Sequence, residues 1–90
     1  GLESEYSFVK TNNKGIYIET IKEAYDSDLT VLRLYEGYGE RKNITLEFAF
    51  DVKEAYLLDL LENKIDNLLI NGNKVNFDIK PFEIITLGIK

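Results

Sequence analysis

The sequence predicts an all-β fold, an antiparallel β-sandwich of about seven or eight short strands in a single domain over residues 1–90. Three observations predict it. Apolar and polar residues alternate with a period of two, the alternating runs are rich in β-branched and aromatic residues, and turn-forming clusters separate the runs. Ninety residues fit one domain, and an apolar content of 44% supplies a core.

Residues 16–21 and 30–36 are the first two predicted strands, bounded by turn-rich clusters at 11–15, 26–28 and 36–41. In the first strand, the alternation predicts one face with Ile16, Ile18 and Thr20, and another with Tyr17, Glu19 and Ile21. In the second strand, Leu32 and Leu34 oppose Val31, Arg33 and Tyr35.

Residues 43–50 show the clearest alternation, which predicts an inward face of Ile44, Leu46, Phe48 and Phe50. The run from Asn71 to Asn73 lies between two further apolar stretches. It indicates that residues 68–71 pair with residues 74–80 as a hairpin, because Asn-Gly supplies the positive φ of a two-residue loop. Pro81 lacks an N–H donor and is expected between strands, before a last strand in residues 82–89.

Residues 55–70, AYLLDLLENKIDNLLI, fit two structures equally well. Six leucine and isoleucine residues recur at spacings near 3.6, which is typical of an amphipathic helix. Strand, turn and strand is the other interpretation, and a helix here would make the fold α+β.

The composition excludes several classes of function. The chain has no cysteine and no histidine, so we expect no disulfide, no thiolate metal site and no nucleophilic triad within it. A net charge of −5 with scattered lysines and arginines argues against a nucleic-acid partner. No apolar run is long enough for a membrane span, and with no visible signal segment and no cysteine we expect a cytoplasmic protein. Residues 1–5 are polar, and we expect them to be loosely held or to derive from a cut end.

Arg33 is a candidate contact residue, because it shares a strand face with Val31 and Tyr35. A charged group in such a place needs a partner or access to a rim. We expect an ion pair with a neighbouring carboxylate such as Glu36, Glu47 or Glu83. The alternative is a contact with another domain or with a sugar.

Glu36 and Glu83 could be interpreted as the carboxylate pair of a glycosidase, which requires a separation of about 5–5.5 Å for retention. Sixteen acidic residues make chance pairs unavoidable in a chain of this length, so we expect no catalytic residue here. The acidic clusters at 26–28 and 51–55 lack the oxygen set of a calcium loop and are interpreted as solvated turns.

Tyr38 lies between two glycines in the loop 36–41 and is the tyrosine most suited to a ligand or interdomain contact. Exposed aromatic faces stack on sugars, but a tyrosine on a strand is more often half-buried with its hydroxyl at the edge. The latter is expected for the other five, namely Tyr6, Tyr17, Tyr25, Tyr35 and Tyr56.

Four elements occur in a recognisable order. The first is a strand end with an acidic turn, made by Ile21, Lys22, Glu23, Asp26 and Asp28, and the second is the Arg-Leu-Tyr-Glu run, Arg33, Leu34, Tyr35 and Glu36. The third is a Leu-Leu-Glu stretch, Leu60, Leu61 and Glu62. The fourth is a Pro-Phe-Glu-Ile element, Pro81, Phe82, Glu83 and Ile84, which is followed by Thr86 and Leu87. In this order the chain, from about residue 15 to residue 90, resembles the C-terminal β-domain of glycoside hydrolase family 38, the α-mannosidases.

The resemblance implies an accessory, non-catalytic domain of a larger glycosidase that hydrolyses α-mannosides with retention. It also implies that the catalytic domain and its divalent metal, usually zinc, lie elsewhere, so that this chain itself binds no cofactor or metal. It favours strand, turn and strand for residues 55–70. The residues expected to mark the fold or to contact other domains are Arg33, Tyr35, Glu36, Tyr38, Pro81, Phe82 and Glu83.

The partners expected from this interpretation are the upstream domains, and a mannose-containing glycan is a further candidate. A surface that once packed on those domains would also cause weak self-association. The alternative function is a free-standing carbohydrate-binding or protein-interaction module. An enzyme acting alone is the interpretation that the sequence supports least.

Overall fold

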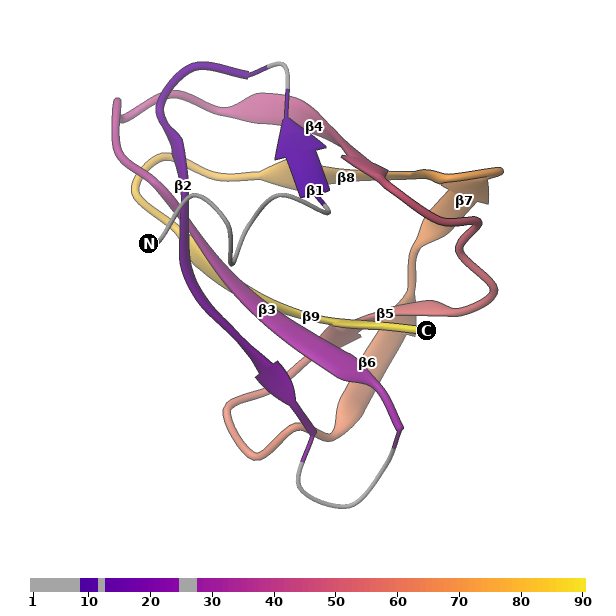
Figure 1. Ribbon diagram of the computed structural model, residues 1–90. Coiled ribbons are helices and arrows are strands. Elements are labelled where there is room, and N and C mark those ends of the chain that lie inside the picture. Colours follow the sequence, from indigo (N-terminus) through magenta and orange to yellow (C-terminus); the bar gives the residue numbers. More distant parts are fainter. Residues whose placement is uncertain (1–8, 12, 25–27) are drawn as a thin grey trace.

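The structure, a computed structural model, describes residues 9–11, 13–24 and 28–90. This part of the chain forms nine strands in two antiparallel sheets, which confirms the predicted sandwich (Figure 1). The strands are β1 (Val9–Thr11), β2 (Ile16–Glu23), β3 (Thr30–Glu36), β4 (Lys42–Phe48), β5 (Ala55–Leu58), β6 (Lys64–Asn67), β7 (Leu69–Asn71), β8 (Lys74–Ile79) and β9 (Ile84–Ile89). The sequence pattern had not indicated the three-residue β1.

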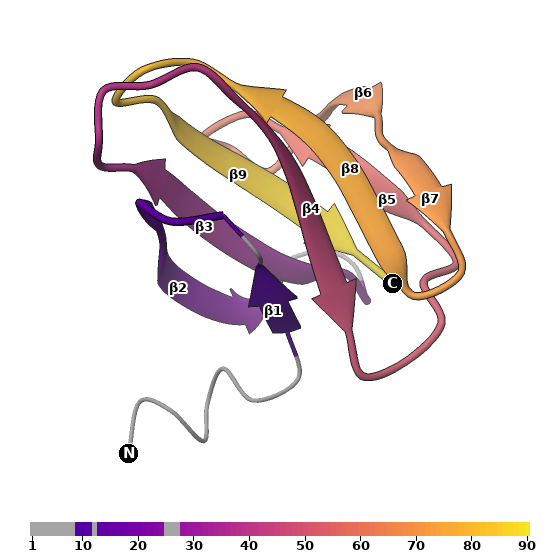
Figure 2. The same cartoon turned by 90° about the horizontal axis from the view of Figure 1, so that it is seen from above.

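The sheets form two layers, and β4 and β8 lie across β3 and β9 when the molecule is viewed from above (Figure 2). The four-stranded sheet has the order β1-β4-β8-β7, and the five-stranded sheet has the order β2-β3-β9-β5-β6. Because β9 pairs with both β3 and β5, the last strand of the chain is central in its sheet.

The core lies between the layers and is made by alternate residues of β3, β4, β8 and β9. Fully or nearly fully buried are Leu32, Leu34, Ile44, Leu46, Phe48, Val75, Ile79, Leu87 and Ile89. Phe50 does not follow the prediction: β4 ends at Phe48, and Phe50 is 41% exposed, with its ring 5.4 Å from that of Phe48.

Strand β2 contains a β-bulge that the simple alternation did not predict. Ile18 pairs with Leu34 but Thr20 pairs with Arg33, so Glu19 is the extra residue. The residues of β2 after the bulge therefore face the opposite side from the one that simple alternation predicts. Ile21, predicted opposite Ile16 and Ile18, therefore packs against the same core.

Residues 55–70 are strand, turn and strand, as the family resemblance implied and contrary to the helical pattern. The Asp59 carboxylate accepts hydrogen bonds from the N–H groups of Leu61 (2.8 Å) and Asn63 (2.9 Å), which closes a turn in place of a helix. Glu62 has a φ of 65°, and Leu60 is 80% exposed, so the leucines form no buried helical stripe. After β6 the chain crosses at Leu68 to β7 in the other sheet.

The predicted hairpin is confirmed, since β7 pairs with β8 across a two-residue loop, Gly72 and Asn73. Gly72 has a φ of 62°, as the first central position of a type II′ turn requires. Pro81 lies between β8 and β9, as predicted.

Several predictions fall outside the described residues, namely those for residues 1–5, Tyr6, Tyr25 and Asp26. In the part of the chain that is described, no helix has the length and apolar character needed to cross a membrane.

Candidate functional site

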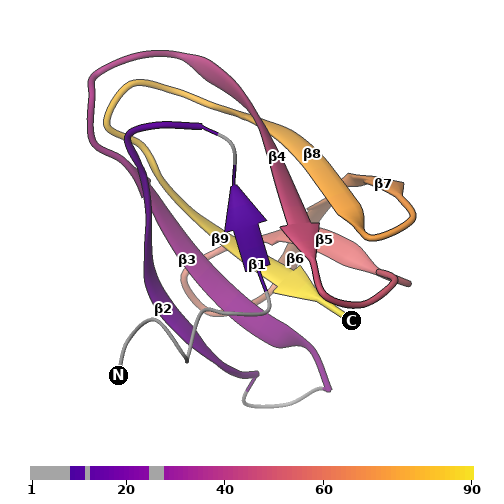
Figure 3. The same cartoon turned by 45° about the horizontal axis from the view of Figure 1, so that its top comes forward.

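The β3–β4 and β8–β9 loops lie side by side at one end of the sandwich (Figures 1 and 3). We call residues 36–42 and 80–83 the loop end. It contains five of the seven residues singled out from the sequence, namely Glu36, Tyr38, Pro81, Phe82 and Glu83, and Tyr35 directly precedes it. Arg33 lies further along β3.

Glu36 is the organising residue of the loop end. Its side chain lies on the core face of β3 and is completely buried. Its carboxylate accepts hydrogen bonds from the N–H groups of Tyr38 (2.9 Å), Gly39 (2.6 Å), Glu40 (3.1 Å) and Phe82 (2.9 Å). Three of these donors belong to one loop and the fourth to the other, so a single carboxylate holds both loops in place.

Lys42 adds the charge partner. Its Nζ lies 3.4 Å from Glu36 Oε2 and 4.6 Å from the centroid of the Tyr38 ring, and it donates to the Lys14 carbonyl. Only 13% of its side chain is exposed, so the ion pair is largely shielded from solvent. Lys42 thereby joins the turn before β2 to the other two loops.

These contacts fix the ionisation of Glu36. Burial by itself raises the pKa, but the N–H donors of Phe82, Tyr38, Glu40 and Gly39 outweigh burial and lower the pKa from 4.5 to about 2. A general acid or base that works near neutral pH needs a pKa close to that pH and access to a substrate. Glu36 has neither, so the geometry assigns it a structural role.

We expect the stability of the chain to depend on pH through Glu36. Its pKa is lower in the folded state than in the unfolded state, so its contribution is complete above about pH 4.5 and is lost as the pH falls toward 2. Urea unfolding curves at a series of pH values between 6 and 2 measure this loss. A free energy of unfolding that is unchanged over this range would contradict the assignment.

Three aromatic side chains are exposed around the loop end, and we call Tyr17, Tyr38 and Phe82 the aromatic rim. Their exposed fractions are 51%, 53% and 61%. Each ring lies against a glycine: a Cβ added at Gly37, Gly15 or Gly39 would lie 2.7, 2.6 and 2.7 Å from the rings of Tyr17, Tyr38 and Phe82, respectively. The glycines therefore allow the rings to lie close to the backbone, and larger residues there would displace them.

Phe82 is held in an unusual conformation. Its φ of 58° lies in the left-handed region, which costs a non-glycine residue roughly 1–2 kcal/mol. The bond from its N–H to Glu36 and the bond from Lys80 N–H to the Glu83 carboxylate (2.8 Å) hold the turn in place. Pro81 is exposed in the same turn, and the Glu83 carbonyl accepts the Glu36 N–H (3.0 Å).

The ion pair expected for Arg33 is wrong. Within the described residues, Arg33 forms no ion pair with Glu36, Glu47 or Glu83. Residues 33 and 36 differ by an odd number along a strand, so Glu36 points into the core and Arg33 to the outer face. Arg33 is flanked there by Thr20 and Thr86, and its Nε is buried without a hydrogen-bond partner.

The carboxylates of Glu36 and Glu83 both accept hydrogen bonds from backbone N–H groups, as carboxylates that hold a loop do. Among the described residues, no group of three or more acidic side chains is arranged to hold a metal ion. Sequence reasoning missed the exposure of Tyr17, which was expected to be half-buried in the core, and the position of Lys42. The glycines at 15, 37 and 39 were the available signal, since the rings rest on them.

Comparison with known proteins matches residues 15–87 to the family model described as glycosyl hydrolases family 38 C-terminal beta sandwich domain. The chain is also 30% identical over 89 residues to alpha-mannosidase 2C1 of Homo sapiens, and 30% identical over 90 residues to alpha-mannosidase 2C1 of Mus musculus. These alignments cover 93% and 94% of this chain but only 9% of each relative. With the two-sheet fold and the matched span in agreement, the chain belongs to the family of glycoside hydrolase family 38 C-terminal β-sandwich domains.

Proposed function

We propose that the chain is a non-catalytic accessory domain of an α-mannosidase-like glycoside hydrolase. The observation that carries this proposal is that the chain spans about 9% of the length of the two mannosidases that it matches. The carboxylates of Glu36 and Glu83, the candidate pair, also accept backbone N–H groups within the domain. In this proposal the longer polypeptide hydrolyses α-mannosides with retention and holds its divalent metal, such as zinc, in another domain. The lack of cysteine favours the cytoplasm as its compartment.

The aromatic rim supports a specific mode of packing against other domains of the longer polypeptide. Tyr38 and Phe82 expose more than half of their surface, yet both lie on loops fixed by the buried carboxylate of Glu36. Aromatic groups held rigidly at a surface lose little conformational entropy on contact, which is why they are favoured in interface cores. When the chain is alone, the same rim is available for weak self-association.

We expect the double substitution Tyr38→Ser and Phe82→Ser to loosen the domain from the longer polypeptide without unfolding it. Both side chains are exposed, so the melting temperature of the 90-residue chain should change little. In the longer polypeptide, limited proteolysis next to the domain should be faster, and hydrolysis of an aryl α-mannoside should lose heat stability.

The matched control is Leu69→Ser, which removes an apolar side chain that is 74% exposed on β7 and is not part of the aromatic rim. It should leave proteolysis and heat stability unchanged. Equal effects of the control and the double variant would contradict packing through the aromatic rim.

A carbohydrate-binding module is the second candidate function, and the same rim favours it. Each ring lies against a glycine and leaves about half of its surface exposed, an arrangement that suits stacking on a sugar ring. Titration with mannose oligosaccharides discriminates the two functions. Saturable shifts of the Tyr17 and Tyr38 signals favour sugar binding, whereas no response favours packing against protein.

A further inference from the structure

Strand β9 has an uncovered edge at its beginning. The register between β5 and β9 runs from Ala55↔Ile89 to Leu58↔Thr86 and stops there, because the chain turns away at Asp59. On its other side, β9 continues to pair with β3 as far as Tyr35↔Ile84. Ile84 therefore has a strand neighbour on the β3 side only, within the described residues.

The hydrogen-bonding phase of the ladder shows where the backbone of Ile84 points. Lys90 and Glu54 exchange two hydrogen bonds on the β5 side (2.8 and 2.9 Å), whereas the Glu83 carbonyl accepts from Glu36 on the β3 side (3.0 Å). Bonding direction alternates from one residue to the next along an antiparallel strand, so residues an even number apart, such as Ile84 and Lys90, point to the same side. The N–H and C=O of Ile84 therefore point toward the side that β5 has left, where no strand of the described residues faces them.

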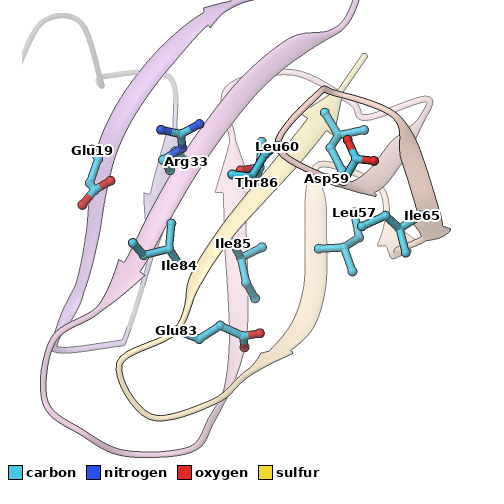
Figure 4. Close-up of a pocket in the computed structure, with 11 residues that line it drawn as sticks. Glu19, Arg33, Leu57, Asp59, Leu60, Ile65, Glu83, Ile84, Ile85 and Thr86 are labelled. Atoms are coloured by element: carbon cyan, nitrogen blue, oxygen red, sulfur yellow. The ribbon is translucent and has the colours of Figure 1, made fainter.

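A groove of about 420 Å³ opens at this place (Figure 4). Its lining includes Arg33, Leu60, Ile65, Ile84 and Thr86. A second hollow of about 440 Å³ shares Leu57, Glu83 and Ile85 with it. Because the two hollows meet at these residues, the opening follows the exposed edge of β9.

Arg33 supplies an independent sign of a missing partner. It lines the groove (Figure 4), and its Nε is buried without an acceptor in the described part of the chain. A buried donor that lacks a partner is costly, so an oxygen atom brought into the groove would be stabilised there.

The charges around the groove restrict what that oxygen can be. Glu19, Asp59 and Glu83 also line it, so the lining carries three acidic residues and one arginine. A further carboxylate would be repelled by them, whereas an uncharged carbonyl oxygen would not. Leu60 and Ile65, 80% and 59% exposed, add apolar surface for the side chains of an occupant.

We propose that the groove binds an extended, uncharged peptide segment from another part of the longer polypeptide, which adds as a short strand to β9 at Ile84. A backbone carbonyl of this segment accepts the Arg33 Nε–H, and its apolar side chains contact Leu60 and Ile65. Addition of a strand to an exposed sheet edge is a common mode of peptide recognition. This inference rests on the proposed function, because the occupant comes from the rest of the longer polypeptide. In the Homo sapiens relative the match covers 9% of the length, so about 91% lies outside the matched region.

The experiment compares amide hydrogen exchange of the 90-residue chain with that of the same residues in the longer polypeptide. Ile84 N–H should exchange rapidly in the chain alone and at least about 100-fold more slowly in the longer polypeptide. Ile85 N–H, which is directed toward β3, is the internal control and should be protected in both. Rapid exchange of Ile84 in both proteins overturns the inference.

Arg33→Met tests the role of the guanidinium. It keeps an apolar stem but removes the donor, so protection of Ile84 in the longer polypeptide should fall about 10-fold while Ile85 is unaffected. Loss of exchange protection at both Ile84 and Ile85 would mean that the fold has changed. The Arg33→Gln variant, which retains an N–H donor, should then restore the protection of Ile85 and part of the protection of Ile84. No change at Ile84 in a folded Arg33→Met variant overturns the contact with Arg33.

Two further measurements identify the occupant. Protection of Ile84 should change less than about 2-fold between low and high salt, and a strong loss in high salt overturns an uncharged segment. Protection that rises with the concentration of the 90-residue chain would indicate a second copy and overturns the stated source. Hydroxyl-radical labelling of Tyr38 and Phe82 in the same samples separates the two proposals: if the rings are shielded but Ile84 exchanges, only the groove inference fails.

Discussion

Replacing Glu36 by glutamine is expected to lower the midpoint of thermal unfolding by more than about 10 °C. The carboxylate accepts from four backbone N–H groups in a fully buried position. A glutamine amide has one acceptor oxygen and places N–H donors toward donors, so several buried groups would lose their partners. Lys42 would also lose its partner in the largely shielded ion pair. Differential scanning calorimetry measures the change.

Glu40→Gln is the matched control, because it removes a carboxylate from the same loop. The Glu40 side chain is 61% exposed, and its carboxylate lies 3.9 Å from Lys42. Exposed pairs of this kind contribute little, so the midpoint should move by only a degree or two. The Glu36→Gln variant should also lose most of the pH dependence described above. If both variants melted alike, Glu36 would not be the residue that holds the loop end.

The strands were largely predictable because alternation records which side of a sheet each residue faces. The inward residues of β3, β4 and β8 follow from it directly. The same rule, applied consistently, places Glu36 with Leu32 and Leu34 and not with Arg33. Glu36 should therefore not have been included among the expected partners of Arg33. The two residues are three apart along one strand, so their side chains lie on opposite faces.

Other features depend on tertiary structure that a pattern does not record. The bulge at Glu19 inserts one residue, and the position of such an insertion depends on pairing with β3. The helical spacing of the leucines in residues 55–70 competes with a turn that is closed by Asp59 and Asn63. In that segment pairing with β9 overrides the helical spacing, and the family resemblance was what favoured strands over a helix there.

The residues of the loop end were singled out from the sequence, but their contacts were not predictable from it. The Arg-Leu-Tyr-Glu and Pro-Phe-Glu-Ile runs are 46 residues apart at the Glu36–Phe82 contact, and only the fold shows that they meet. A pattern of residue types also cannot show that the donors to Glu36 are backbone N–H groups, because every residue except proline carries one. The glycines of the loop were visible, and the close approach of the rings explains them.

Among the three glycines that lie against the aromatic rim, Gly15 is expected to be the most damaging to replace by alanine, at about 3 kcal/mol of unfolding free energy. Gly15 has a φ of 81°, so alanine there incurs backbone strain. Its added Cβ would also lie 2.6 Å from Tyr38 Cγ and 2.9 Å from Lys42 Nζ. Because Cγ is the base of the ring, rotation about the Cβ–Cγ bond does not relieve this contact, and Tyr38 would have to change its χ1 rotamer. Urea unfolding of the variant measures the loss.

Gly72→Ala separates the two contributions. Gly72 also has a positive φ, 62°, but an added Cβ there has nothing within 4 Å, so its cost is backbone strain alone, about 1 kcal/mol. The excess at Gly15 then reports the displacement of Tyr38 and Lys42, and this displacement should also shift the fluorescence of the exposed tyrosines. Equal losses at the two sites would mean that the ring of Tyr38 moves freely, in which case Tyr38 could not serve as a rigid contact of the aromatic rim.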